Sequence, residues 1–537
     1  MSVSEKGVVY MSQITARVLN GYRLPFTPVR LLALCLLLFP IAGCSDLPPL
    51  ENRIASTTEL NTGATRLGQA IAPRLAAHPG KSGVVGLADA RDAFAARVLL
   101  ARAAERTLDV QYYIWRKDIT GTMLFAALRQ AADRGVRVRL LLDDNNTSGL
   151  DSVLAALNAH PNIQVRLFNP FVFRRVRALG YLTDFARANR RMHNKSFTAD
   201  NQVTIVGGRN VGDEYFGAGD DVSFADLDVM AVGPVVTDVS KDFDRYWNSN
   251  SSYPVEGLLQ PADHAGLEAL QAAASRIETS PEALAYVRAV RGSTFTQELI
   301  AGSLALEWAP TRMISDDPAK GLGLAAPDTL VISKFKETMG RPVSELDLVS
   351  PYFVPTDEGA STFAHLAATG VKVKVLTNSL EATDVVAVHA GYAPYRKTLL
   401  EAGVSLYEFR RTAPPAAKKR AGVLGGSSAS SLHGKTFAVD RSRVFIGSFN
   451  FDPRSARLNT EMGFVIDSPA LAERIAAAFD GRIPAEAYEV RLSTDGKLYW
   501  IERHGDKLLR YDVEPGTSFL QRASVSFMSL LPIDWLL

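Results

Sequence analysis

The chain has 537 residues, 47% of them hydrophobic, which is enough to bury two α/β cores. Its formal net charge is +2, from 59 basic and 57 acidic residues, so global charge does not indicate a nucleic-acid binder. Both cysteines, Cys35 and Cys44, lie near the N-terminus, which excludes a disulfide framework and a thiolate metal site from the body of the protein.

The N-terminus has the pattern of a secretory signal. Basic residues precede an apolar run at residues 31–39, which is too short to span a bilayer as a mature helix. The run ends in Ile-Ala-Gly-Cys, and a cysteine directly after Ala-Gly resembles the bacterial lipobox. We expect a lipoprotein signal peptide at residues 1–43, with lipid on Cys44. An ordinary signal peptide and a buried cysteine are the alternatives, and the start at Met1 or Met11 stays open.

Residues 44–80 lack strong periodicity and are expected to be a tether that leaves the lipid anchor. After them, residues 108–115 predict a strand, residues 124–132 a helix and residues 136–143 a second, alternating strand. This order is typical of an α/β layer structure.

The same order of predicted elements recurs 235–240 residues later, with strands at residues 346–353 and 371–377 around a helix at residues 363–368. A near-constant offset indicates a duplicated domain. We therefore expect an α/β fold with mixed sheets, its two copies at residues 81–255 and 341–485. A helical connection at residues 256–340 would join them, and residues 486–537 would form an extension. The apolar C-terminal segment is expected to dock on the body, with a membrane surface as the alternative.

A polar motif accompanies each copy. Histidine, lysine, aspartate and asparagine follow one another at identical spacings in both: His193, Lys195, Asp200 and Asn210, then His433, Lys435, Asp440 and Asn450. The histidine and lysine of each copy are two residues apart, so on a strand their side chains share one face. Two such sets predict one site that is built from two half-sites.

This HxKx4D signature, with Gly-Ser-x-Asn after its second copy, resembles the phospholipase D superfamily. Within it, the strings at residues 207–210, 224–228, 247–249, 377–380 and 531–533 are similar to C-type bacterial cardiolipin synthases. The resemblance covers nearly all of the chain after residue 80. It implies two phospholipase D-like α/β/α sandwich domains related by a pseudo-two-fold, with the active site between them.

The residue types suit an anionic phosphodiester. Lys195 and Lys435 would neutralise its charge, and the amides of Asn210 and Asn450 would bind its non-bridging oxygens, with help from the Ser448 hydroxyl. The first copy has Gly208 in place of this serine, so the halves are expected to be unequal. No metal or other cofactor is required, because the lysines supply the positive charge.

The two histidines suit a double displacement. One neutral imidazole would attack phosphorus and form a covalent phospho-histidine, while the other, protonated, would give its proton to the leaving alkoxide. The sequence leaves the assignment open, and we favour His193 as the nucleophile over His433.

Four carboxylates belong to the predicted site, and one of them has an alternative. Asp200 and Asp440 complete the catalytic signature, although turn stabilisation is favoured over a direct catalytic role. The resemblance also implies that a downstream acid orients each histidine. This role falls to Glu461 in the second copy and to Asp226 in the first, where Asp228 is the alternative.

The predicted activity is a phosphatidyl transfer that makes cardiolipin from phosphatidylglycerol and a second phospholipid such as phosphatidylethanolamine. Hydrolytic phospholipase D activity, a nuclease or phosphodiesterase of the same superfamily, and a non-catalytic envelope protein are the alternatives. Nucleic acid is an unlikely substrate, and a partner protein stays unknown. The expected location is the bacterial cell envelope, on a membrane through the lipid anchor and facing the periplasm.

Overall fold

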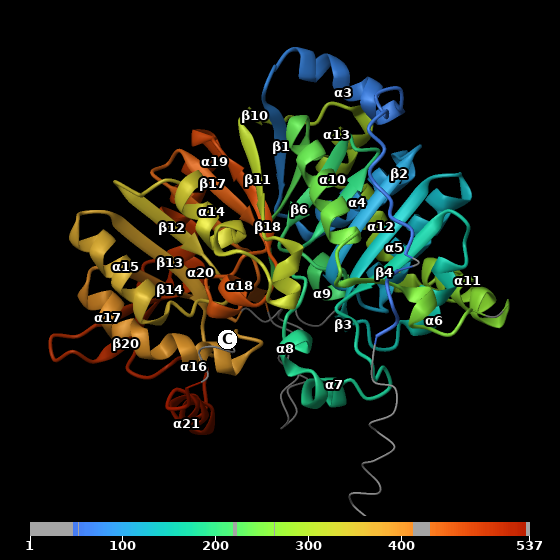
Figure 1. Cartoon of the computed structure of the whole chain (residues 1–537). Helices are drawn as coiled ribbons and strands as arrows, with labels where there is room; N and C mark the ends of the chain where they lie inside the picture. The colour runs from blue at the N-terminus through green and yellow to red at the C-terminus, as the bar shows by residue number, and fades with distance from the viewer. Residues whose placement is uncertain (1–46, 52, 219–222, 263, 412–429, 533–536) are drawn as a thin grey trace, which may run out of the picture. The chain divides into compact units, whose positions relative to one another are not determined.

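The computed structural model describes residues 47–51, 53–218, 223–262, 264–411, 430–532 and 537 (Figure 1). The expected signal peptide and Cys44 lie outside these residues. Within the described ranges, no helix combines the length and the apolar character that a membrane span requires.

The first domain is built on a mixed sheet of nine described strands, in the order β10-β1-β8-β6-β5-β2-β3-β4-β9. The β2–β3 and β3–β4 pairs are parallel, and the other pairs are antiparallel. The strands are β1 (Ser82–Leu87), β2 (Thr107–Ile114), β3 (Arg137–Asn146), β4 (Ile163–Phe168), β5 (Ser196–Ala199), β6 (Val203–Gly207), β8 (Asp228–Val232), β9 (Ser252–Pro254) and β10 (Glu307–Ala309).

Helices cover both faces of this sheet, as the alternation of its side chains requires. Leu140 of β3 belongs to the same buried cluster as Leu124 and Leu128 of α5, whereas the next residue, Leu141, packs with Phe243 of α10. The helices are α3 (Arg66–Ala76), α4 (Ala90–Ala103), α5 (Ile119–Asp133), α6 (Asp151–Asn158), α7 (Ala178–Thr183), α8 (Phe185–Ala188), α9 (Asp213–Phe216), α10 (Pro234–Trp247), α11 (His264–Glu278), α12 (Pro281–Arg291) and α13 (Thr294–Ala301).

The second domain repeats this plan in a sheet of ten described strands, in the order β11-β18-β17-β16-β12-β13-β14-β19-β20-β21. Here the β12–β13 and β13–β14 pairs are parallel. The strands are β11 (Thr311–Ser315), β12 (Glu345–Val349), β13 (Lys372–Asn378), β14 (Ser405–Phe409), β16 (Thr436–Val439), β17 (Arg443–Gly447), β18 (Met462–Ile466), β19 (Ala487–Leu492), β20 (Leu498–His504) and β21 (Lys507–Tyr511).

Its two faces are covered in the same way. Val375 of β13 packs in one cluster with Phe363 of α15, and the adjacent Leu376 packs in another with Phe479 and Ile483. The helices are α14 (Val331–Thr338), α15 (Thr356–Ala368), α16 (Val386–Tyr392), α17 (Arg396–Glu401), α18 (Pro453–Arg457), α19 (Pro469–Ala477), α20 (Ile483–Glu486) and α21 (Phe519–Met528); the short turns are η2 (Val255–Gly257), η3 (Pro318–Leu322), η4 (Pro327–Thr329), η5 (Ala393–Tyr395) and the π-turn η7 (Ala478–Arg482).

In both domains, a proline begins the helix that comes after β8 or its counterpart β18. In the first domain, α10 begins at Pro234, and in the second domain α19 begins at Pro469. Proline suits the first helical position because it lacks the N–H that would stay unpaired there. Ser468 also caps α19 by accepting a hydrogen bond from the Leu471 N–H.

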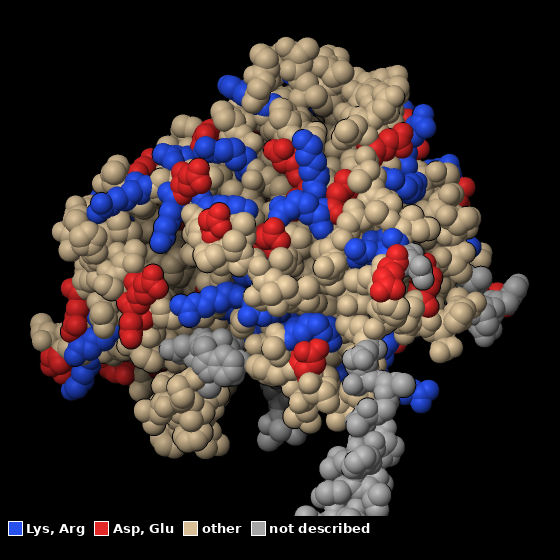
Figure 2. Space-filling view, in the orientation of Figure 1, with Lys and Arg blue, Asp and Glu red and all other residues tan. Residues whose placement is uncertain are grey.

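The two sheets share one buried apolar cluster. Val206 and Val229 of the first sheet pack there with Ile446 and Phe464 of the second. Strand order, parallel core pairs and helices on both faces recur in both domains, so the predicted fold class is confirmed. On the face drawn in Figure 2, basic and acidic side chains are intermingled.

Three segments outside the repeats differ from the expectation. The expected tether packs on the first domain from Arg53 onward, where the guanidinium donates to the carbonyls of Asn248 and Ser252. The connection, expected to be helical, also supplies an edge strand to each sheet, β10 and β11. The C-terminal extension adds β19, β20 and β21 to the second sheet before α21. Each added strand forms hydrogen bonds with backbone N–H and C=O groups that would otherwise be unpaired at the edge of the sheet, which explains these additions.

Candidate active site

Both histidine–lysine segments are buried and lie where the two domains meet. His193 and Lys195 come directly before β5, and His433 and Lys435 come directly before β16. The His193 N–H donates to the carbonyl of Thr460 (2.9 Å), and the His433 N–H donates to the carbonyl of Ala225 (2.8 Å). Each histidine segment therefore runs beside the segment that precedes the acid of the other domain.

This reciprocal packing exchanges the carboxylates between the domains. Nδ1 of His193 lies 2.9 Å from Oε2 of Glu461, and Nδ1 of His433 lies 2.5 Å from Oδ2 of Asp226. A carboxylate partner favours the tautomer with the proton on Nδ1, which leaves Nε2 of each ring for chemistry. The repeat predicted the acids, but it carried no sign that each acid serves the histidine of the other half.

Two serine hydroxyls hold Glu461. Ser448 Oγ donates to Oε2 (2.5 Å), and Ser455 Oγ donates to Oε1 (2.7 Å). The Glu461 backbone is fixed as well, because its N–H donates to Oδ2 of Asp316 (2.8 Å). Ser448 was expected to bind the substrate phosphate, and in the present geometry its hydroxyl donates a hydrogen bond to Glu461. Ser455 was missed because nothing in its short helix signals the contact.

The first domain has no room for an equivalent serine. A Cβ added at Gly208 would lie 2.1 Å from Oδ1 of Asp226. The Asp226 carbonyl accepts a hydrogen bond from the buried guanidinium of Arg209 (2.7 Å). Asp228, the alternative acid, instead forms a buried ion pair with Arg97 (2.8 Å).

Burial and charge divide the two acids. Burial raises the pKa of Glu461 to about 7. Asp226 is buried too, but the neighbouring His433 and Lys435 hold its pKa well below the usual range. Asp226 is therefore ionised at neutral pH, whereas Glu461 titrates near neutrality.

The pKa values of the two histidines differ as well. Burial, with Lys195, Lys435 and His433 nearby, depresses the pKa of His193 well below its usual value. Burial and Lys435 also lower the pKa of His433, but Asp226 opposes them. His433 is thus the better placed of the two to carry a proton.

The predicted phosphate-binding groups are buried beside the histidines. Lys195 Nζ donates to the His193 carbonyl (2.5 Å), and Lys435 Nζ lies 3.1 Å from Nδ1 of His433. Burial lowers the pKa of both lysines. In the described part of the chain, Nδ2 of Asn210 and Oδ1 of Asn450 have no hydrogen-bond partner. The free atom of Asn210 can donate a hydrogen bond to a ligand, whereas the free atom of Asn450 can only accept one.

Aromatic rings line both half-sites. Tyr113 packs edge-on against His193 at 5.0 Å between ring centroids. Tyr215 and Phe224 pack against His433 at 5.3 and 5.2 Å. These contacts restrict the orientation of each imidazole and narrow its exposure to water. The motifs gave no sign of these rings. Tyr215 stands at the position of the first copy that is equivalent to Ser455 in the second.

The two motif aspartates lie at the other end of the strands from the histidines. Asp200 accepts hydrogen bonds from the N–H groups of Glu105, Arg106 and Thr107, and its φ is 51°. Asp440, also at φ 51°, accepts equivalent bonds from residues 343–345. Four strand residues separate each aspartate from the lysine of the same motif, so the two Cα atoms are roughly 16 Å apart. The geometry gives both aspartates a structural role rather than a place at the reacting atoms.

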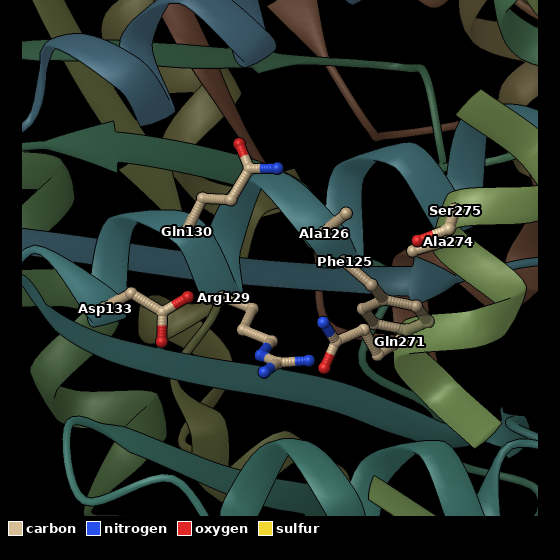
Figure 3. A pocket seen from close by; sticks show the side chains of 8 residues that line it. All are labelled: Phe125, Ala126, Arg129, Gln130, Asp133, Gln271, Ala274 and Ser275. Carbon is tan, nitrogen blue, oxygen red and sulfur yellow. The ribbon is translucent and has the colours of Figure 1, made fainter. Parts of the chain in front are cut away.

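A separate pocket of about 220 Å³ lies between α5 and α11 (Figure 3). Its charged lining residues are Arg129 and Asp133, beside the amides of Gln130 and Gln271. It contains none of the motif residues and no histidine, so we do not connect it with phosphodiester chemistry.

Comparison with known proteins agrees with this site. Residues 99–247 and 335–483 each match the family described as "Cardiolipin synthase, PLD-like domain". The chain belongs to this family. The matches cover both halves and include both histidine–lysine segments, so the predicted duplication of a phospholipase D-like domain is confirmed.

Relatives of this PLD-like cardiolipin synthase family span the chain. Cardiolipin synthase C of Escherichia coli (strain K12) is 51% identical over 88% of this chain and 100% of its own length. An uncharacterized protein of Helicobacter pylori (strain ATCC 700392 / 26695) is 31% identical over 91% of this chain and 96% of its own length. The crystal structure of phosphatidylserine synthase from Haemophilus influenzae Rd KW20 shares the fold, with a TM-score of 0.56 at 13% identity over 88% of this chain and all of that one.

Proposed function

We propose that this enzyme transfers a phosphatidyl group from one phospholipid to a hydroxyl of phosphatidylglycerol and so makes cardiolipin. The observation that carries the proposal is the pair of buried histidines, each held at Nδ1 by a carboxylate of the other domain. The 51% identity to a cardiolipin synthase supports the choice of substrate class.

In the first step, Nε2 of His193 attacks the phosphorus of the donor phospholipid and forms an N–P bond. The P–O bond to the headgroup alkoxide breaks, and that oxygen takes a proton from Nε2 of His433. The depressed pKa of His193 keeps its imidazole neutral and nucleophilic. Ionised Asp226 stabilises the protonated form of His433.

In the second step, His433 accepts the proton of the acceptor hydroxyl. The acceptor oxygen attacks phosphorus, and the N–P bond to His193 breaks. Lys195, Lys435 and the unpaired Nδ2 of Asn210 would donate to the non-bridging oxygens in both steps, and Asn450 would do so through its Nδ2 rather than through its unpaired Oδ1. The charge balance needs no metal or other cofactor in this sequence of steps.

We further propose that the mature chain is attached to a bacterial membrane through lipid on Cys44 and faces the periplasm. The lipobox-like sequence at residues 41–44 supports this proposal. Membrane attachment would keep the enzyme beside its two lipid substrates.

The proposal is tested with the purified chain in vesicles of labelled phosphatidylglycerol, with or without phosphatidylethanolamine. Labelled cardiolipin that is absent with a His193→Ala variant is the expected result. Phosphatidic acid as the only product would establish hydrolysis in place of transfer. Stimulation by phosphatidylethanolamine, with release of ethanolamine, would identify that lipid as the donor.

A further inference from the structure

The described surface carries one group of large apolar side chains on elements that adjoin the active site. We call this group the apolar rim: Phe519, Leu520, Phe527, Leu530 and Leu531 on and after α21, Val385 and Val386 at the start of α16, and Leu182 and Phe185 on α7 and α8. Several are almost fully open, since Leu182 and Leu530 are each 82% exposed and Leu520 is 77% exposed.

Helix α21 is docked on the body, yet its outer face is apolar as well. Its Val525 is buried with Leu380 and with Ala390 of α16, and the terminal Leu537 is buried with Val354. A docked surface helix in water normally turns polar residues outward. Residues 519–531 contain one charged side chain, Arg522, and its guanidinium bonds the Thr517 carbonyl. The segment therefore docks on the body as expected from the sequence, and it also exposes large apolar side chains.

On the second-domain side, the rim connects to the site through Asp384. This residue precedes Val385 and accepts a hydrogen bond from the Tyr352 hydroxyl (2.8 Å). Asp384 is close enough to raise the pKa of Lys435, and Tyr352 is close enough to interact with Tyr113 and Tyr215. Asp384, at the α16 end of the rim, is thus hydrogen-bonded to Tyr352 and lies within electrostatic range of Lys435.

On the first-domain side, a matching connection starts at α7. The Tyr181 hydroxyl of α7 donates to Oδ1 of Asn145 (2.8 Å), and Nδ2 of Asn145 donates to the Tyr113 hydroxyl (3.4 Å). Tyr113 in turn packs edge-on against His193. Apolar elements of both domains are therefore connected to the tyrosines that surround the histidines. Figure 1 draws α7 and α21 on the same side of the domains, and Figure 2 shows few charges there.

We propose that the apolar rim inserts into the interfacial layer of a phospholipid bilayer and holds the two-histidine site over the lipid headgroups. This inference rests on the proposed function, because a phospholipid phosphate must reach the histidines while its acyl chains stay in the bilayer. Neither α7 nor residues 519–531 contain an acidic residue, and Asp184, between Leu182 and Phe185, is ion-paired with Arg187, so repulsion of anionic headgroups is weak there. Exposed aromatic and leucine side chains with few charges are the composition of interfacial anchors.

The first test places a photocrosslinker where lipid contact is expected. Full-length chain with p-benzoylphenylalanine at Leu520 or at Leu182 is irradiated in vesicles of labelled phosphatidylglycerol and phosphatidylethanolamine. The control position is Ile300 on α13, which is 68% exposed. We expect lipid adducts at both rim positions and none at the control. Adducts to a second copy or to another segment of this chain, or equal lipid capture at Ile300, would overturn the proposal.

The second test separates the rim from the chemistry. A Leu520→Gln/Phe527→Gln variant should lose roughly 10-fold in rate on vesicles, because two interfacial side chains are removed. Its rate on dihexanoyl-phosphatidylglycerol, dissolved below the micelle concentration, should stay at the wild-type value, as should both rates of an Ile300→Gln control. Equal losses of rate on vesicles and on the dissolved substrate would overturn the proposal that the rim inserts into the bilayer. Failure of the wild type to make cardiolipin, with lipid adducts still formed at Leu520, would refute the proposed function and retain the rim.

Discussion

His193 is held by Glu461, which accepts hydrogen bonds from two serine hydroxyls. His433 is held by Asp226, whose carboxylate fills the space next to Gly208. The longer acid reaches its histidine across the domain boundary and leaves room for Ser448. The shorter acid would collide with any side chain at position 208. The two copies of the motif therefore place their imidazoles beside different carboxylates, and these carboxylates are held by different neighbours.

The difference separates two chemical roles. Burial raises the pKa of Glu461 to about 7, while His433 and Lys435 keep Asp226 ionised despite its burial. An ionised partner favours a protonated imidazole, and a partner that titrates near neutrality favours a neutral one. The comparison therefore supports His193 as nucleophile and His433 as the acid, an assignment that the motif spacing left open.

The largest effects should come from the histidines and should depend on the leaving group. On phospholipids, His193→Ala and His433→Ala should each lower kcat/KM by at least ~10³-fold. On a p-nitrophenyl phosphodiester, whose leaving group needs no proton, His433→Ala should still form a covalent adduct on His193. Mass spectrometry of the quenched enzyme measures this adduct. An adduct on His433 in the His193→Ala variant would reverse the assignment.

A serine introduced into the first half-site should be more harmful than one removed from the second. In a Gly208→Ser variant the new side chain displaces the Asp226 carboxylate, which should cost about 100-fold in kcat/KM, because small displacements in an active site have effects of this size. Gly212→Ser provides a control at a glycine of the same loop, where the nearest atoms to a new Cβ belong to the side chains of Arg116 and Glu214. Wild-type activity of Gly208→Ser would show that the close approach to Asp226 has no catalytic consequence.

Local patterns in the sequence were sufficient for much of the fold. The strand expected at residues 108–115 is β2 (Thr107–Ile114), and the helix expected at residues 124–132 lies within α5. The strand expected at residues 346–353 is shorter, because Pro351 cannot donate to a ladder and β12 ends at Val349. The edge strand β10 and the added strand β19 were missed, since their pairing depends on open neighbours that a local window does not contain.

In the candidate site too, the features that depend on local sequence were predicted, and those that depend on the packing of the two domains were not. The four histidine and lysine positions follow from spacing, which is a local property of the chain. The exchange of acids is not local, because His193 and Glu461 are 268 residues apart and meet only through the packing of two domains. The contact of Ser448 with Glu461 was missed for the same reason, since a hydroxyl near a phosphate motif gives no sign that it will donate a hydrogen bond to a carboxylate.

A smaller effect is expected from Ser448→Ala, which removes one hydrogen bond to a charged group and should lower kcat/KM roughly 10-fold at pH 7. The pH profile is the sharper measurement. A protonated Glu461 would donate to Nδ1 and move the histidine proton to Nε2, so kcat/KM on the p-nitrophenyl substrate should fall below about pH 7. The Ser448 bond lowers the pKa of Glu461, so its loss should move this acid limb to higher pH.

The matched control is Glu461→Gln, which cannot titrate and should give a low, nearly flat profile over the same range. A profile of Ser448→Ala that coincides with the wild type would separate the acid limb from Glu461. A shift to lower pH would contradict the direction that the hydrogen bond predicts.

The smallest effects on chemistry should come from the motif aspartates, whose loss should appear as stability. Asp200 is fully buried and holds three backbone N–H groups, so Asp200→Ala should lower the free energy of unfolding by about 3 kcal/mol. Asp440 holds equivalent groups nearer to solvent, so Asp440→Ala should cost about half as much, or ~1.5 kcal/mol. Denaturant unfolding measures both, and kcat per folded enzyme should stay within about 3-fold of wild type because neither carboxylate reaches the histidines. A loss of kcat in either variant without a loss of stability would return that aspartate to the catalytic groups.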